Sequence, residues 1–399
     1  MANTQDFQYI DTKSGLAEVV ASLVDASRMA IDTEFHRERT YYPKVALVQI
    51  QWDDRLVLID PLGVDLQALA PVFEGDGLVV MHAASQDLEV FDRACGVVPS
   101  RLADTQIAAG FIGLRTPSLA GLHEHFLNVS LAKGDRLTDW LKRPLNENQL
   151  NYAASDVARL LEIHDLIGEQ LVARGREEWV EAEYDELLRK ASTARDPSEC
   201  WTRIKEARHL KAQPLAVVQA VAAWRELRAR ERDLPVRFVL SDMAVVSVSQ
   251  KVPRSTDDLK GLRGLDERQL RGSVGDSLLE AVAAGRDNEP PTRDKPRNNR
   301  DQAALRPAAS LLSAWLSQHA TDLDIDPALL GTRNDIESVL RDEPCRLSTG
   351  WRAAMAGDPI KQLIAGDAAL AFERGGGLTL EQRSRVPFEV NLPGKSGLG

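Results

Sequence analysis

Short apolar runs separated by turn residues dominate the first third of the chain. Four of these runs are rich in Val, Ile and Leu and have the length of strands rather than of helices. They are Met29–Phe35, Val45–Trp52, Leu56–Ile59 and Leu78–Met81. Asp53-Asp54, between the second and third runs, predicts a hairpin turn. The polar arm before them ends in a helical pattern from Ser14 to about Ser27.

The pattern becomes helical after Met81. A helix is expected from Gln86 to about Cys95, and helix-capping residues mark the starts of later ones. These caps are Asp104, Ser118, and Asn146 with Gln149 three residues on. The last pair is expected to open one long helix through Val172, ended near Gly175. Strands with helices around and after them predict an α/β domain over residues 1–195.

The rest of the chain is expected to be helical, with no long strand after Arg176. Several short helical patterns fill residues 200–286, and residues 302–372 form a second helical region. The Pro-rich, charged residues 287–301 between them have the composition of a linker. The Gly-rich tail, residues 373–399, is expected to be poorly ordered. The predicted architecture is thus one α/β domain followed by two all-α domains.

Composition is that of an ordinary globular protein, with 43% hydrophobic and 27% charged residues. No apolar run approaches the roughly 18–20 residues that a membrane-spanning helix needs, and the polar N-terminus lacks the apolar segment of a signal peptide. Cys95, Cys200 and Cys345 lie far apart and form no metal-binding spacing. We therefore expect reduced thiols, a cytoplasmic location and no membrane partner.

The net charge of −11 argues against a nucleic-acid partner, but the charge is unevenly distributed. Residues 203–237 contain nine Lys or Arg residues against four Asp or Glu, an excess of five positive charges. A local basic patch of this kind is consistent with phosphate contacts. A solvated helix face with internal salt bridges explains it equally well.

Two acids, Asp32 and Glu34, end the first predicted strand. Alternate residues of a strand share a face, so these two carboxylates point the same way and Thr33 points to the opposite face. Carboxylates this close repel each other unless a cation lies between them. The alternatives are a metal site and a strand that ends in solvent.

Two further acids are candidates for the same site. Asp87 lies in the first turn of the helix after a strand, where the helix dipole alone favours an acid. Asp156 lies on the long predicted helix, four residues after Tyr152 and therefore on a neighbouring face, where solvent exposure is the plain alternative. Together, four carboxylates and a phenol suit two Mg²⁺ or Mn²⁺ ions and phosphodiester hydrolysis.

The segments around these acids resemble the motifs of the bacterial ribonuclease D group of 3′→5′ exonucleases. The resemblance covers roughly residues 10–175 and follows the order and spacing of five segments. They are Asp32–Pro43, His82–Phe91, Asp104–Gln106, Thr138–Leu145 and Asn151–Val157. It implies a ribonuclease H-like mixed sheet with flanking helices. Residues 200–286 resemble the helical domain shared by helicases and ribonuclease D (HRDC), whereas residues 302–372 match the second such domain poorly.

The resemblance also implies roles for the site residues. Asp32, Glu34 and Asp156 are expected to hold the metal ion that carries the attacking water. Asp32 is expected to bridge to a second ion, which Asp87 reaches through water. Tyr152 is expected to orient the attacking water. A related subclass has a histidine where this chain has Asn151, so the chain belongs with the tyrosine subclass and His82 is expected to be structural.

RNA contacts are expected at a second set of residues. They are Phe35, Trp140, Arg143, Arg225 and Arg228. For Phe35 the alternative is a core position. The loop that contains Tyr41 and Tyr42 is expected either to contact the RNA strand or simply to pack against the rest of the protein.

The function expected from these features is a metal-dependent 3′–5′ exoribonuclease. It would release 5′-monophosphate nucleotides from RNA 3′ ends with two Mg²⁺ or Mn²⁺ ions, with tRNA precursors as the substrate class and no obligate protein partner. The alternatives are an exonuclease of single-stranded DNA and a non-catalytic RNA-binding scaffold.

Overall fold

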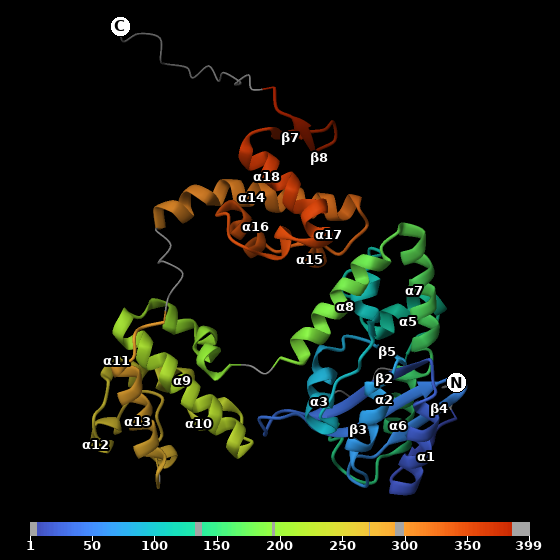
Figure 1. The fold of residues 1–399 in the computed structure, drawn as a ribbon, viewed down its shortest axis with the longest axis horizontal. Helices are drawn as coiled ribbons and strands as arrows, with labels where there is room; N and C mark the ends of the chain where they lie inside the picture. Colours follow the sequence, from blue (N-terminus) through green and yellow to red (C-terminus); the bar gives the residue numbers. More distant parts are fainter. Residues whose placement is uncertain (1–5, 132–137, 194–195, 271, 292–298, 385–399) are drawn as a thin grey trace. The chain divides into compact units, whose positions relative to one another are not determined.

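The structure, a computed structural model, describes residues 6–131, 138–193, 196–270, 272–291 and 299–384. It divides into two compact units (Figure 1). The first comprises residues 1–108 and 117–296, and the second comprises residues 109–116 and 297–399.

A six-stranded mixed sheet is the centre of the first unit, with strand order β1-β4-β3-β2-β5-β6. The strands are β1 (Gln8–Ile10), β2 (Arg28–His36), β3 (Lys44–Trp52), β4 (Arg55–Ile59), β5 (Leu78–Met81) and β6 (Leu102–Asp104). β3 is antiparallel to β2 and to β4, and the other pairs are parallel. The four predicted strands are confirmed. β1 and β6 were not predicted, because three residues are too few to show an alternating pattern.

Helices cover both faces of this sheet. On one face, the core side chains of β2 and β3 pack with apolar residues of α1 (Lys13–Leu23), α2 (Ala70–Glu74) and α3 (Ser85–Cys95). The neighbouring α6 (Glu147–Val157) packs against β2, β3 and β4. Residues 46–50 of β3 are buried without interruption, as expected of a strand covered on both faces.

The predicted long helix after Asn146 is wrong in one respect, because it is two helices. α6 ends at Val157 and α7 (Leu160–Arg174) begins after Arg159, whose φ of −125° and ψ of 15° lie outside the helical region. The predicted caps are confirmed: Asn146 and Gln149 form a capping box, and Gly175 ends α7 in the left-handed conformation. The break puts Asp156 in the last turn of α6 rather than in mid-helix.

The remaining helices of the first unit fall into two groups. One group belongs to the α/β part, and the other forms an all-α bundle. Those of the α/β part are α4 (Thr105–Gly110), α5 (Leu119–Leu127) and α8 (Glu177–Ala191). Those of the bundle are α9 (Ala212–Arg232), α10 (Val236–Val239), α11 (Asp242–Lys251), α12 (Thr256–Leu259) and α13 (Val274–Asp287). The bundle has its own aliphatic core, built mainly on α9, α11 and α13. None of the described helices is both long and apolar enough to cross a bilayer.

The second unit is helical and ends in a hairpin. Its helices are α14 (Asn299–Asp322), α15 (Pro327–Leu330), α16 (Arg333–Leu340), α17 (Gly350–Arg352) and α18 (Asp358–Ala365). The antiparallel strands β7 (Ala368–Phe372) and β8 (Leu378–Gln382) follow. The expectations of no strand after Arg176 and of a poorly ordered tail from residue 373 are therefore wrong up to β8. Residues 385–399 lie outside the described part of the chain.

Candidate active site

The first two acids of the candidate site lie on one face of β2. Asp32 and Glu34 alternate with Ile31 and Thr33, and Ile31 belongs to the core on the other face. The register shifts only after Glu34, so the shared orientation of the two carboxylates is confirmed. Burial, followed by the charges of Asp87, Asp156 and Glu34, raises the pKa of Asp32 well above its usual range. Burial and the charges of Asp156 and Asp87 raise the pKa of Glu34 to about 8.

Asp87 is buried in the first turn of α3 and accepts a hydrogen bond from the Thr33 hydroxyl. The Thr33 hydroxyl therefore ties β2 to α3. Burial raises the pKa of Asp87 to about 6, although the Thr33 hydrogen bond acts in the opposite direction. A second link joins the same two segments, since the Arg37 guanidinium pairs with Glu89 of α3.

Tyr152 and Asp156 come together one turn apart on α6, as predicted. A hydrogen bond between their side chains lowers the pKa of Asp156, but burial outweighs it and raises that pKa to about 7. The Tyr152 ring lies 6.2 Å, centroid to centroid, from Trp140, which is buried. The phenol and the carboxylate are thus held beside the acids of β2.

The electrostatics of these acids favours a cation. The largest influences on Asp32 and Glu34 after burial are other carboxylates, and buried like charges of this kind are stabilised by a positive ion. Among the described residues, however, no three Asp, Glu, His or Cys side chains lie close enough to form a ready-made metal site. The four carboxylates fit Mg²⁺ or Mn²⁺ in their oxygen chemistry.

Two other polar groups have structural roles. The His82 Nδ1 atom lies 3.0 Å from the Thr105 hydroxyl, and burial lowers the pKa of His82, which agrees with the expected structural role. The Asp104 carboxylate accepts hydrogen bonds from the backbone amides of Ala83 and Ala84 as well as from the start of α4. Asp104 therefore shapes the turn that leads into α3 and Asp87.

Two of the arginines expected to contact RNA have partners within the fold. Arg143 forms a bidentate pair with Asp60, with N···O distances of 2.6 and 2.7 Å, and also donates to the Ala46 carbonyl. Arg225 is only 6% exposed and donates to the Leu240 carbonyl and to Asp242. Both guanidinium groups are thus engaged by protein partners, Arg225 in a buried position and Arg143 with 22% of its side chain exposed. Their proposed contacts with RNA stay predictions.

The other three residues expected to contact RNA differ in exposure. Trp140 is buried beside Tyr152, which favours a packing role. Phe35 and Arg228 are partly exposed, and the Arg228 guanidinium lies 6.0 Å from the centre of the Trp224 ring. Their proposed contacts with RNA stay predictions.

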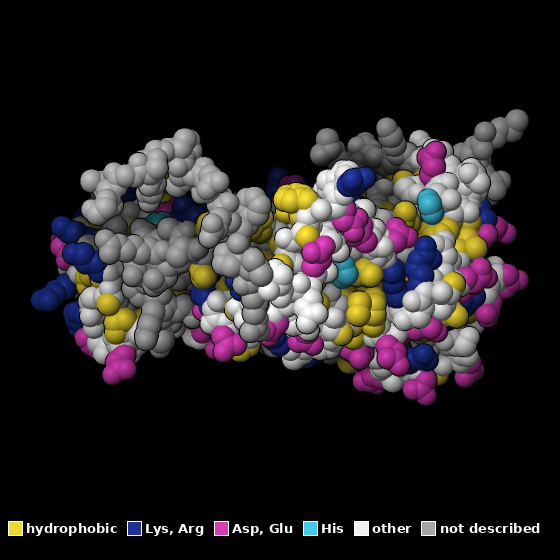
Figure 2. All heavy atoms as spheres, turned by 90° about the horizontal axis from the view of Figure 1, so that it is seen from above, with side chains coloured by type: hydrophobic (Ala, Val, Ile, Leu, Met, Phe, Trp, Pro, Cys, Tyr) yellow, Lys and Arg dark blue, Asp and Glu magenta, His cyan; other side chains and the backbone are white. Residues whose placement is uncertain are grey.

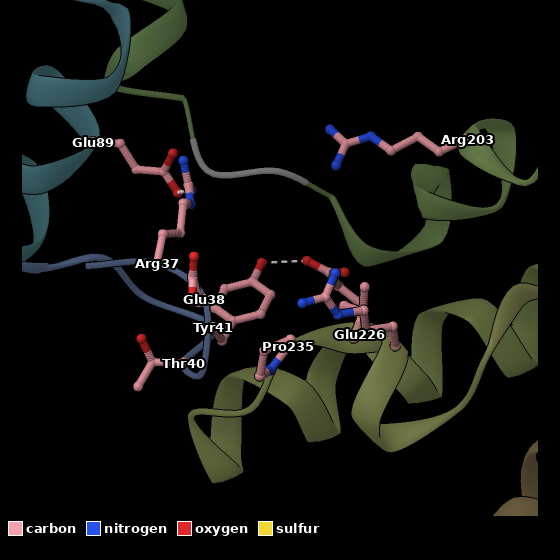
Figure 3. Close-up of a pocket in the computed structure, with 10 residues that line it drawn as sticks. Arg37, Glu38, Thr40, Tyr41, Glu89, Arg203, Glu226 and Pro235 are labelled. Atoms are coloured by element: carbon pink, nitrogen blue, oxygen red, sulfur yellow. Dashed lines mark hydrogen bonds and ion pairs between the residues drawn. The ribbon is translucent and has the colours of Figure 1, made fainter. Parts of the chain in front are cut away.

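A polar cluster joins the loop after β2 to the end of α9 (Figure 3). The Tyr41 hydroxyl is hydrogen-bonded to Glu226, and Arg230 donates to both groups. The backbone amides of Tyr41 and Tyr42 donate to Asp233 at 3.1 and 3.0 Å. The Tyr42 ring packs under the Arg93 guanidinium at 4.2 Å. Packing of this loop, one of the two predicted alternatives, therefore accounts for both tyrosines, and no local sequence signal predicts partners almost 190 residues away.

Exposed basic residues surround the Tyr41 cluster. Arg203 and Arg237, together with Arg37 and Tyr41, line a pocket of about 430 Å³ shown in Figure 3. Among the basic side chains of the 203–237 segment whose burial is described, the exposed ones are Arg203, Lys205, Lys211, Arg232 and Arg237. On the face of the molecule in Figure 2, basic side chains are interspersed with acidic ones. The local excess of positive charge is thus carried by residues other than Arg225.

Comparison with known proteins agrees with this fold and site. A family of 3′-5′ exonucleases matches residues 7–172, and the HRDC domain family matches residues 214–282. These matches define the class as a 3′–5′ exonuclease with an HRDC domain, and the 3′–5′ exonuclease family depends on divalent metal ions.

Full-length relatives identify the family. The chain is 34% identical to the ribonuclease D of Zymomonas mobilis over 378 residues, which is 92% of this chain and 96% of the relative. It is also 34% identical to the ribonuclease D of Nitrobacter hamburgensis, over 92% of this chain and 97% of the relative. The chain belongs to the ribonuclease D family and is a 3′–5′ exoribonuclease.

Solved structures give the same result. The crystal structure of Escherichia coli RNase D, described as an exoribonuclease involved in structured RNA processing, matches with a TM-score of 0.80 and 31% identity. The match covers 90% of this chain and 99% of that one. The catalytic core of RRP6 from Trypanosoma brucei matches with a TM-score of 0.56 and 26% identity over 71% of this chain and 80% of that one.

Proposed function

We propose that this exoribonuclease removes nucleotides one at a time as 5′-monophosphates, with Asp32, Glu34, Asp87, Tyr152 and Asp156 as its catalytic site. Asp32, Glu34, Asp87 and Asp156 would hold two divalent ions, Mg²⁺ or Mn²⁺, when these are bound. The ions would supply activation of the attacking water and stabilisation of charge in an in-line displacement.

One observation carries this proposal. Burial, and after it the charges of carboxylates from three separate elements, β2, α3 and α6, raises the pKa values of Asp32 and Glu34. Repulsion between buried acids destabilises a fold. Residues whose pKa values are strongly shifted in this way are therefore candidates for a functional site.

Tyr152 in this proposal positions the attacking water rather than removing its proton. An unperturbed tyrosine has a pKa of about 10, too high for an efficient base at neutral pH. Its hydrogen bond with Asp156 holds the hydroxyl beside a metal-binding carboxylate. Replacement with Phe is therefore expected to lower kcat and to leave KM for RNA nearly unchanged.

Replacement of single acids tests the assignment. Asp32→Ala, Asp87→Ala and Asp156→Ala are expected to abolish hydrolysis of labelled RNA and to leave the circular dichroism spectrum unchanged. Asp92→Ala is a matched control, because Asp92 is an exposed acid on α3, the same helix that carries Asp87. Full activity in any of the three site variants would refute the assignment. Activity with Mg²⁺ that EDTA abolishes would exclude the scaffold alternative.

The substrate class proposed is the tRNA precursor with a 3′ extension. The name of the Escherichia coli relative places that protein in structured RNA processing, which supports a structured substrate here. Digestion of 3′-extended tRNA, unstructured RNA and single-stranded DNA side by side, with Asp87→Ala as the blank, tests this class. Faster digestion of DNA than of either RNA would favour the DNA exonuclease alternative.

The domain boundaries belong to the proposal as well. Residues 1–195 form the exonuclease domain, residues 200–286 the HRDC-like domain, and residues 302–372 a second, divergent helical domain. A cytoplasmic location is proposed because all three cysteines are free thiols.

A further inference from the structure

Gln49 of β3 is a fully buried polar side chain without a partner. Its exposed fraction is 0%, and neither its Oε1 nor its Nε2 atom has a hydrogen-bond partner among the described residues. Buried side-chain amides are nearly always hydrogen-bonded, because an unmet donor or acceptor is costly in a folded protein. A buried amide whose donor and acceptor both lack a partner therefore indicates a functional role that offsets this loss of stability.

The strand register puts this amide beside the candidate site. Gln49 lies directly opposite Asp32 in the antiparallel pair of β3 with β2, before the register shift that follows Glu34. Side chains of directly opposite residues lie on the same face, with Cβ atoms roughly 4.5–5.5 Å apart. Gln49 therefore lies on the face of the sheet that carries Asp32 and Glu34.

The neighbours of Gln49 within the sheet on this face are mostly apolar. Across the other strand pair it lies opposite Leu58, and Leu47 precedes it on the same face, so both are apolar. Gln51 follows two residues on, but its Nε2 atom already donates to the Asp53 carbonyl at 2.7 Å. The Oε1 atom of Gln51 is also unpaired, so a pair between the two amides is the competing explanation.

We propose that Gln49 is a positioning residue that donates its side-chain amide hydrogen to the Asp32 carboxylate when that carboxylate binds the divalent cation. This bond would fix which Asp32 oxygen lone pairs face the ion. Carboxylates that bind metals are themselves commonly oriented by hydrogen bonds of this kind. The inference rests on the proposed role of Asp32.

Replacement of the amide by an apolar side chain of similar length separates a positioning role from a structural one. Gln49→Met is expected to keep or raise the melting temperature, because an unmet polar group is removed from the interior. It is expected to weaken Mn²⁺ binding to the RNA-free full-length protein, measured by calorimetry, and to lower kcat, each by roughly 10–100-fold. KM for a short RNA should stay unchanged, and a higher Mn²⁺ concentration should restore part of the lost rate.

Gln51→Met is the matched control, since it changes the same residue type on the same face of the same strand, opposite Ala30 instead of Asp32. It is expected to keep wild-type Mn²⁺ affinity and kcat. An equal loss in Gln51→Met would overturn the proposal in favour of an amide pair. Wild-type affinity and kcat in Gln49→Met would overturn it outright.

Two more variants keep the test decisive. If Gln49→Met fails to fold, Gln49→Asn retains an amide that is one methylene shorter, and an undiminished Mn²⁺ affinity in it would overturn the proposal. Asp32→Asn tests the underlying function, because wild-type Mn²⁺ binding in that variant would remove the proposed site itself. Loss of binding in Asp32→Asn with none in Gln49→Met would defeat the Gln49 inference alone.

Discussion

The acids of the candidate site have pKa values that span the neutral range before a metal binds. The pKa is raised to about 6 for Asp87, about 7 for Asp156 and about 8 for Glu34, chiefly by burial. Metal ligands must be deprotonated, so protons compete with the ion below these values. We expect Mn²⁺ affinity to rise as the pH increases from 6 to 8, with release of protons on binding. Calorimetry in buffers of different ionisation enthalpy measures that release, and a pH-independent affinity would contradict the prediction.

Arg143 illustrates a residue whose structural partner is not revealed by its neighbours in the sequence. Beside Trp140 and Lys142 it resembles an RNA contact, but its partner Asp60 lies more than 80 residues earlier. Burial would raise the pKa of Asp60, yet hydrogen bonds from Arg143 and Tyr9 outweigh it, so that pKa is lowered. The charge on Arg143 thus stabilises the fold, and no periodicity in the sequence reveals such a distant pair.

Removal of Arg143 should therefore destabilise the protein. Because Asp60 is mostly buried, we expect Arg143→Ala to cost about 3 kcal/mol of unfolding free energy, the lower end for breaking a buried pair. A lowered folded-state pKa contributes stability above the unfolded pKa of about 4. This contribution is lost as the pH falls through the pKa of Asp60 in the folded state. The difference in unfolding free energy between wild type and Arg143→Ala, the stability gap, should therefore narrow in acid. Thermal melts from pH 7 to pH 3 measure the gap, and a gap that widens in acid would contradict the assignment.

At the scale of elements, the sequence was informative wherever a local signal exists. Short apolar runs predicted β2 to β5, and capping residues predicted the starts of α5 and α6. The break at Arg159 was missed because the apolar stripe continues from α6 into α7, and only backbone angles reveal it. The Thr33–Asp87 and Gln49–Asp32 neighbours depend on how α3 and β3 pack against β2, which alternation alone does not specify.

The loop after β2 depends on the end of α9 for its order. Asp233, the left-handed residue that ends α9, accepts from the amides of Tyr41 and Tyr42. These bonds are exposed, so each is worth about 1 kcal/mol. We expect Asp233→Ala to speed hydrogen exchange at these two amides roughly fivefold, as seen by NMR or mass spectrometry. Asp196→Ala, which removes a similar exposed acid at a helix start, should leave them unchanged. Equal exchange in wild type and Asp233→Ala would show that the loop is ordered without α9.

At the scale of the whole molecule, the resemblance predicted the order of an α/β domain and two helical regions. It did not predict that residues 109–116 pack with the C-terminal region rather than with the sheet. In that unit, the Asp326 carboxylate accepts from the Thr116 amide and hydroxyl, and the rings of Phe111 and Trp351 lie 5.1 Å apart. Contacts across more than 200 residues leave no trace in a local pattern.

The exposure of the basic residues across the molecule changes which of them are expected to bind RNA. Within the positive segment between residues 203 and 237, Arg225 and Arg228 were the residues predicted to contact RNA, but Arg225 is buried. The exposed Arg203 and Arg237 line the pocket beside Tyr41 and are the better candidates. Each phosphate contact releases condensed counterions, so the logarithm of affinity falls with the logarithm of salt in proportion to the number of contacts. We expect Arg203→Ala plus Arg237→Ala to weaken RNA binding and to reduce that salt slope by about 2, one per contact.

A matched variant separates a phosphate contact from a general change of charge. Arg286→Ala plus Lys260→Ala removes two exposed basic residues from the same helical bundle, each paired with an acid on its own helix or an adjacent turn. It changes the net charge equally, so a long-range effect of charge alone would lower affinity as much as the Arg203 and Arg237 pair does. Both double variants are made in the catalytically inactive Asp87→Ala protein. Their binding to single-stranded RNA, measured by fluorescence anisotropy at roughly 50 to 300 mM salt, gives both slopes. Identical slopes in the two double variants would mean that the basic residues near Tyr41 act only as a solvated surface.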